Sequence, residues 1–96
     1  MDTSQTEQAW LEAVGARLAG GGDALALPAD VEVRSLLRVT KVTADATGVR
    51  YLAPLTSYLI GRAAGRADAK GETFDLRAAV DAISELAAGW APAPEG

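Results

Sequence analysis

Four stretches of the chain repeat apolar residues every three or four positions, the spacing that places side chains on one face of an α-helix. The first follows Ser4 and Glu7, whose capping-box spacing predicts a helix start. Gly20-Gly21-Gly22 predicts its end, because glycine tolerates the left-handed backbone of a helix exit. Its apolar face consists of Trp10, Leu11, Val14 and Leu18. Leu25 and Leu27, in the connector that follows, are expected to cover the core.

A second helix is predicted after Pro28. Asp30 is its expected N-cap, because an aspartate side chain can accept hydrogen bonds from the free backbone N–H groups of a first helical turn. Thr47-Gly48 predicts its end. Its apolar face consists of Val33, Leu36, Leu37, Thr40 and Ala44.

The third stretch, from Pro54 to about Ala67, is apolar on nearly every side. Proline suits the start of a helix, because its φ is fixed near the helical value. A helix that is apolar all round is typical of the centre of a domain. Leu59 is therefore expected to be buried, and Leu59→Ala to cost about 2–5 kcal/mol. Gly61 and Gly65 predict a close helix crossing inside the bundle, with a crossing between two chains as the alternative.

A fourth helix is predicted from Asp75, its N-cap, with Phe74 packed against its first turns. Its apolar stripe consists of Leu76, Val80, Ile83, either Leu86 or Ala87, and Trp90. Pro92 and Pro94 predict its end and a tail over residues 92–96. No stretch alternates apolar and polar residues over a useful length, so no strand is expected.

Together these patterns predict an all-α protein. Residues 1–96 are expected to form one domain, a single small four-helix bundle with short connectors. Its ordered core should run from about residue 4 to residue 91.

The missing residue types exclude several kinds of chemistry. The 96 residues include no cysteine and no histidine, which rules out thiol nucleophiles, disulfides and the usual ligands of structural zinc. No carboxylates have metal-ligand spacing, and no serine or threonine has a histidine to activate it. We therefore expect no metal, no cofactor, no catalytic residue and no enzymatic activity. The absence of a secretory signal or of about 20 consecutive apolar residues predicts a cytoplasmic protein without membrane contact.

Charge is distributed unevenly along the chain. The stretch from Val33 to Arg66 holds six basic residues and one acidic residue, a net charge of +5, whereas the whole chain has −4. The favoured interpretation is pairing within the chain, with Asp81 and Glu85 of the fourth helix and with the acidic residues of the first helix; the alternative is a binding edge for an anion, nucleic acid or an acidic partner. Nucleic acid is disfavoured, because the chain is acidic overall and lacks a basic recognition helix. The candidate binding residues are Arg34, Arg38, Lys41, Arg62 and Arg66.

The segment from Ala53 to Gly61, followed by Ala63-Ala64-Gly65, resembles the motif A-P-L-T-x-Y/F-L-hydrophobic-G-x-A-x-G. This motif is typical of a small helical domain of unknown function from GC-rich bacteria. The similarity extends to Trp10-Leu11 and Trp90-Ala91-Pro92 and so covers about residues 7–92. The motif residues, expected to be structural, are Pro54, Leu55, Thr56, Tyr58, Gly61 and Gly65.

Members of that family occur alone or fused to the C-terminus of nucleotidyltransferases similar to those that attach guanylate to molybdopterin. The resemblance implies a link to molybdenum-cofactor maturation or to a molybdoenzyme. It implies no transferase activity, because the glycine-rich nucleotide-binding half of such enzymes is absent from this chain.

Three functions are compatible with the sequence. The first is a non-catalytic helical accessory domain that binds another protein, a molybdenum-cofactor nucleotidyltransferase or a molybdoenzyme. The second is a small anion- or cofactor-binding protein that uses Arg62 and Arg66. The third is a weak nucleic-acid-binding regulator. The sequence leaves the identity of the partner and the existence of a homo-oligomer open.

Overall fold

The computed structural model describes residues 3–23 and 25–90 and contains four helices over those ranges. They are α1 (Thr3–Ala19), α2 (Asp30–Thr47), α3 (Leu52–Ala69) and α4 (Leu76–Ala88). No strand is present in the described part of the chain. The prediction of an all-α helical bundle is confirmed. The side chain of Ser4 and the predicted tail at residues 92–96 lie outside the described residues.

The helix ends follow local sequence signals, with two corrections. The side chain of Asp75 accepts the Ala78 N–H at 3.0 Å and caps α4 as predicted. Gly48, at φ 70°, ends α2 in the left-handed conformation that glycine adopts without strain. Asp30, however, is the first residue of α2 and not its N-cap. The N-cap is Ala29, whose N–H donates to Glu32 Oε1 at 2.9 Å, so a carboxylate one turn into the helix satisfies the free end.

The third helix begins two residues earlier than predicted, at Leu52. Pro54 therefore lies inside the first turn. This position is tolerated because the first four N–H groups of a helix have no partner within the helix, so the missing N–H of proline costs nothing there.

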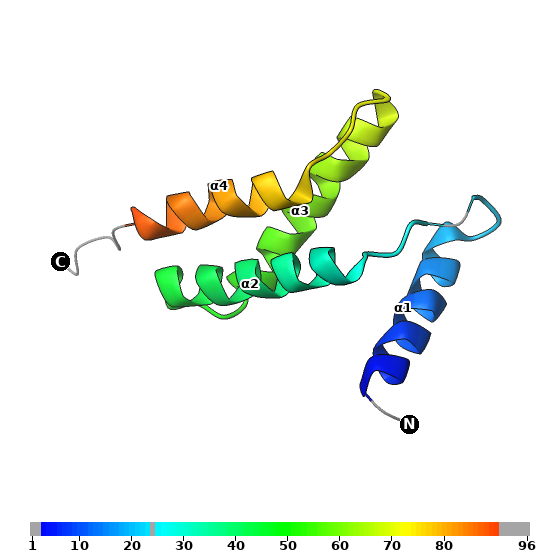
Figure 1. The fold of residues 1–96 in the computed structure, drawn as a ribbon, viewed down its shortest axis with the longest axis horizontal. Helices are drawn as coiled ribbons and strands as arrows, with labels where there is room; N and C mark the ends of the chain where they lie inside the picture. The colour runs from blue at the N-terminus through cyan, green and yellow to red at the C-terminus, as the bar shows by residue number, and fades with distance from the viewer. Residues whose placement is uncertain (1–2, 24, 91–96) are drawn as a thin grey trace.

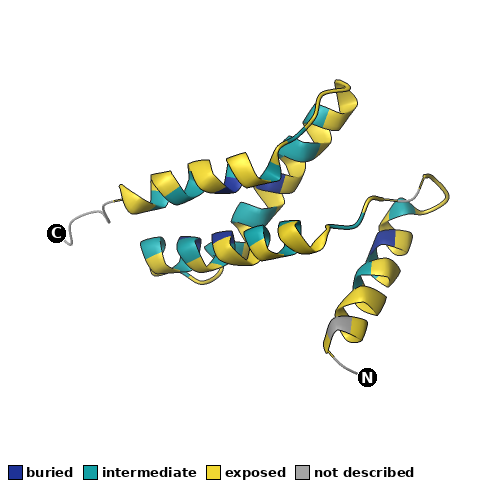
Figure 2. Cartoon of the chain, viewed as in Figure 1, coloured by how far each residue is buried: buried dark blue, intermediate teal, exposed yellow. Residues whose placement is uncertain are grey.

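The core lies where α2, α3 and α4 meet (Figure 1). Its buried apolar residues are Val39, Ile60 and Val80, one from each of these helices. Figure 2 shows dark-blue, buried positions on these helices around their junction. Half-buried residues packed against them are Leu36, Phe74, Leu76 and Ile83. Helix α2 packs along both α3 and α4, whereas α3 and α4 have few contacts with each other. The central helix is therefore α2.

The prediction that α3 lies at the centre of the domain is wrong. Ile60 is its only described residue that is buried, and the neighbouring Leu59 is 64% exposed. Gly61 and Gly65 are also exposed, and a Cβ added at either would meet nothing within 4 Å. The predicted close crossing at these glycines inside the bundle is therefore absent.

Helix α1 stands apart from the other three in Figure 1 and has no close backbone contact with them. It packs on the connector instead. Gly15 is buried, and a Cβ added there would lie 3.1 Å from Leu27 Cδ2. Leu27 thus covers α1 and not the core, and Leu25 is exposed, so the placement predicted for both leucines is wrong.

Candidate functional site

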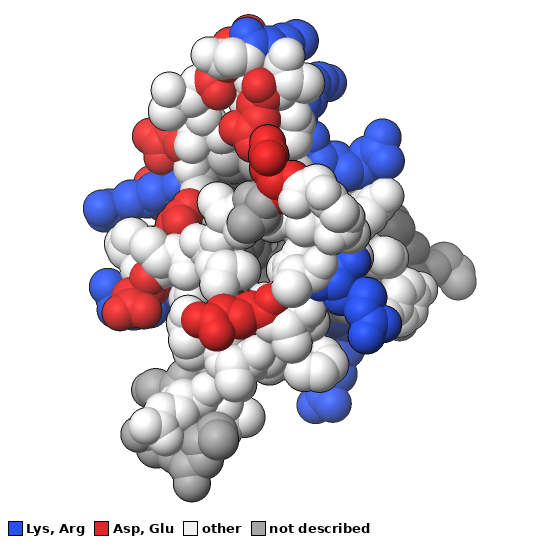
Figure 3. Space-filling view, turned by 90° about the vertical axis from the view of Figure 1, so that its right-hand side faces the viewer, with Lys and Arg blue, Asp and Glu red and all other residues white. Residues whose placement is uncertain are grey.

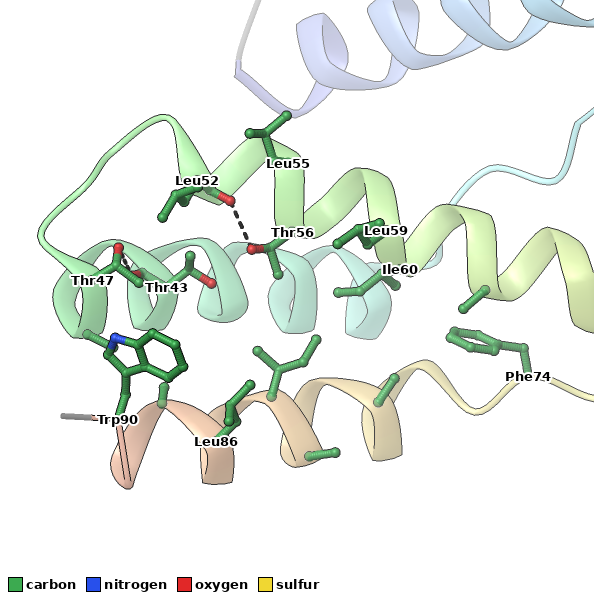
Figure 4. A pocket seen from close by; sticks show the side chains of 16 residues that line it. Thr43, Thr47, Leu52, Leu55, Thr56, Leu59, Ile60, Phe74, Leu86 and Trp90 are labelled. Carbon is green, nitrogen blue, oxygen red and sulfur yellow. Dashed lines mark hydrogen bonds between the residues drawn. The ribbon is translucent and has the colours of Figure 1, made fainter. Parts of the chain in front are cut away.

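The main concave feature of the described residues is an apolar groove between α3 and α4 (Figure 4). Its volume is about 620 Å³, and its floor is the C-terminal half of α2. None of its sixteen lining residues is charged. They are Thr43, Ala46, Thr47, Leu52, Leu55, Thr56, Leu59, Ile60, Ala63, Phe74, Ala79, Ala82, Ile83, Leu86, Ala87 and Trp90. We call this feature the α3–α4 groove.

The groove exists because α3 and α4 both pack on α2 but diverge from each other. In Figure 1, α3 crosses behind α2 and α4, which lie side by side. The space between α3 and α4 would be filled by a further helix in a closed four-helix bundle. Because α1 does not occupy it, the apolar side chains that line it are left partly in solvent.

Large side chains form the rim of the groove. Leu55 and Leu59 on α3 are more than half exposed, and so are Leu86 on α4 and Trp90, two residues beyond its end. Figure 4 shows the leucines of α3 on one side of the groove and Leu86 and Trp90 on the other. Exposed large apolar side chains that gather around one hollow are typical of interaction sites.

Two of the three threonine hydroxyls in the groove are bonded to their own helices. Thr47 Oγ1 donates to the Thr43 carbonyl, and Thr56 Oγ1 donates to the Leu52 carbonyl, both at 2.8 Å (Figure 4, dashed lines). The lining offers no charged group and no residue able to act as a general base. Its chemistry therefore suits an apolar surface better than a polar small molecule, whose orientation would require convergent donors and acceptors.

Two of the three predicted basic residues of α2, Arg38 and Lys41, form ion pairs at the surface. Arg38 Nη2 contacts Asp81 Oδ1 of α4 at 2.6 Å, and both side chains are about half exposed. This contact agrees with the favoured interpretation of pairing within the chain. Lys41 Nζ donates to Asp45 Oδ2 at 2.7 Å, and this hydrogen bond, together with the carboxylate charge, raises the pKa of Lys41.

The other predicted basic residues lie elsewhere. Arg62 Nη1 donates to Tyr58 Oη at 3.2 Å, with its guanidinium 5.8 Å from the ring centroid. Arg66 borders a second cavity of about 300 Å³, together with Lys70, Glu72 and Asp75. Arg34 is exposed on α2. Figure 3 shows Lys and Arg at both edges of one face with Asp and Glu between them, so that face presents no continuous basic patch.

The motif residues divide between the groove and the surface. Leu55 and Thr56 line the α3–α4 groove, whereas Tyr58 supports Arg62 and the two glycines face open space. The groove itself was missed by sequence reasoning, which assigned these apolar residues of α3 to the core. The available signal was that α3 is apolar on more sides than one neighbouring helix can cover.

Two absences complete the description. Among residues 3–23 and 25–90, no three acidic, histidine or cysteine side chains are grouped so as to hold a metal ion. In the same ranges, no helix combines the length and the apolar character needed to cross a membrane.

These features define a small all-α domain with an open, uncharged groove. The chain belongs to the family described as a domain of unknown function (DUF6457), whose profile matches residues 2–95. Comparison with curated proteins gave no match, and comparison with solved structures gave none either.

Proposed function

We propose that this domain is a non-catalytic protein-interaction module whose α3–α4 groove binds an apolar helix. The observation that supports it is the uncharged groove rimmed by Leu55, Leu59, Leu86 and Trp90. Removing apolar surface from water stabilises a complex by about 25 cal/mol per Å². An amphipathic helix laid in an apolar groove is a common mode of protein recognition.

We further propose that a client of this module is a molybdenum-cofactor nucleotidyltransferase or a molybdoenzyme in the bacterial cytoplasm. Support for this part comes from the resemblance of residues 53–65 to the motif described above. The motif contributes Leu55 and Thr56 to the groove wall, so the part of the chain that resembles the family also lines the proposed binding surface.

Two matched leucine variants test the proposal. Leu59 lines the groove and is 64% exposed, whereas Leu37 is 63% exposed on α2 and lies outside the groove. Leu59→Asp should abolish the capture of a client from an extract of the source cell, and Leu37→Asp should retain it. The captured client is then purified and titrated against the same variants. Equal loss or equal retention in both variants would place the interaction elsewhere.

A second candidate function is the binding of a phosphorylated small molecule by Arg62 and Arg66. The observation in its favour is that Arg66 and Lys70 border the same 300 Å³ cavity. A ligand that binds only the folded state raises the melting temperature. Guanine nucleotides or phosphorylated pterins should therefore raise it in the wild type and not in Arg66→Ala. An unchanged wild-type melting temperature excludes this function for those ligands.

A further inference from the structure

We propose that the helix occupying the α3–α4 groove is α1 of a second copy of this chain, so that two copies exchange their α1 helices. This inference rests on the helix-binding part of the proposed function and assigns the groove a different occupant, so a client could enter the groove only in place of α1. The observations behind it are an exposed apolar edge on α1 and an unfilled apolar groove in the same chain.

Helix α1 presents an apolar edge on which two large side chains are mostly in solvent. Trp10 is 68% exposed and Leu18 is 72% exposed. They lie eight residues apart, with Val14 midway between them, so the three side chains follow one line along the helix. Helix α1 has no close contact with α2, α3 or α4, so none of these three helices covers this edge.

The connector packs on one side of α1. Leu27 packs on Gly15, and Leu11 and Val14 on the same side of α1 are half-buried. Leu27 lies three residues before the start of α2. The contact therefore fixes the elbow between the two helices and leaves the edge with Trp10 and Leu18 to face another molecule.

The surface area indicates how much must be covered. The accessible surface of the chain is 7555 Å², whereas a folded monomer of this mass exposes about 5,200 Å². The radius of gyration is 15.5 Å, against about 12.5 Å for a globular chain of this length. This total includes the residues outside the described ranges, so the excess of about 2,300 Å² per chain is an upper bound on the surface that a partner covers. Over two chains this bound lies within the roughly 2,000–5,000 Å² that obligate dimers bury.

Mutual exchange uses this surface completely. When α1 of each copy enters the groove of the other, both grooves are filled and both α1 edges are covered around one two-fold axis. Closed two-fold assemblies of this kind leave no binding surface to extend into a filament. Each copy then supplies the helix that the groove of its partner lacks.

Sedimentation of the purified chain tests the proposal. The wild type should sediment as a dimer, and both Trp10→Asp and Leu59→Asp should convert it to a monomer. Their controls are Ala16→Asp, on the opposite side of α1, and Leu37→Asp, matched to Leu59 in exposure; both should remain dimeric. Circular dichroism checks that each variant is helical, and Leu86→Asp on the α4 wall replaces Leu59→Asp if that variant does not fold.

Introduced cysteines identify which copy supplies the helix. The chain has no natural cysteine, so Leu18→Cys in one tagged copy and Leu59→Cys in a differently tagged copy create a unique pair. A short bis-maleimide should link the two tags. A second variant carries Leu18→Cys and Leu59→Cys in the same chain. If the reagent cross-links these two cysteines within one chain at high dilution, α1 lies in its own groove and the proposal is overturned.

Two other results also overturn the proposed exchange of α1 helices. One is a wild type that is monomeric at every concentration, and the other is a dimer that survives both Trp10→Asp and Leu59→Asp. The proposed function fails separately. If the chain is monomeric but captures a client that Leu59→Asp loses, the groove binds a helix that is not α1. If no client and no second copy depends on Leu59, both proposals fail.

Discussion

Helices α2 and α3 are equal in length, at eighteen residues each, but they differ in what they bury. Helix α2 has one apolar face and one polar face, and it lies against both α3 and α4 with Val39 fully buried. Helix α3 is apolar on nearly every side, yet only Ile60 is buried. In this chain, the helix whose apolar residues lie on one face packs most extensively, whereas the helix with apolar residues on nearly every side buries only one of them. The surplus apolar surface of α3 becomes the wall of a groove.

The largest expected effect separates two adjacent residues of α3. Ile60→Ala should lower the free energy of unfolding by about 2–5 kcal/mol, because it leaves a cavity beside Val39 and Val80. Leu59→Ala should cost less than about 1 kcal/mol, because its side chain is already in solvent. Urea unfolding measures both in the Trp10→Asp background, where the proposed dimer does not contribute. Equal losses would place Leu59 in the core of the monomer.

The second prediction compares Asp75 and Asp30, which were both predicted to cap a helix but of which only Asp75 does so. Asp75→Ala should destabilise the chain by about 0.5–2 kcal/mol, since the Ala78 N–H loses its acceptor. Asp30→Ala should cost less than about 0.5 kcal/mol, because Asp30 makes no capping bond and α2 keeps its Glu32 contact. Thermal unfolding of the two variants side by side measures the difference; a larger loss in Asp30→Ala would reverse the assignment.

The third prediction concerns the exposed glycines of α3. A Cβ at Gly61 meets nothing, so Gly61→Ala should stabilise the monomer by about 0.5–1 kcal/mol through higher helix propensity. The measurement is urea unfolding in the Trp10→Asp background. A loss of stability there would show that another element lies close to Gly61. If only dimerisation weakens in the wild-type background, the interface between copies includes this glycine.

The smallest expected effect is that of the Arg38–Asp81 pair. Its side chains are about half exposed, so a double-mutant cycle with Arg38→Ala and Asp81→Ala should give a coupling of about 0.2–1 kcal/mol. The coupling should shrink as salt is added, because surface charges are screened. A coupling that does not change with salt would show a less solvated contact between α2 and α4.

The helix ends show most clearly what could be predicted from the sequence alone. Asp75 and Gly48 act within one turn of their own position, so residue type and spacing were sufficient to predict them. Asp30 was misplaced by one residue, because Glu32 satisfies the same end of α2 from inside the helix. These two ways of satisfying free N–H groups at a helix start look alike in sequence.

The arrangement of the helices could not be read in the same way. Periodicity showed that α3 is apolar all round, but this pattern fits both a central helix and a helix shared with another molecule. The groove depends on the angle between α3 and α4, which no residue spacing encodes. The elbow at Leu27 and Gly15 joins residues twelve apart through a contact that neither residue type suggests.

The hydrogen bonds of the groove threonines also affect how water occupies the groove and which heat-capacity change accompanies its filling. The hydroxyl groups of Thr47 and Thr56 donate their protons to carbonyls of their own helices. Water in an empty groove therefore has few groups with which to form hydrogen bonds. Its release should dominate the thermodynamics of filling the groove. Titration calorimetry at several temperatures should then show a distinctly negative heat-capacity change on assembly. Apolar association of this kind weakens on cooling, so the filled groove should empty more readily in the cold than at the growth temperature of the cell.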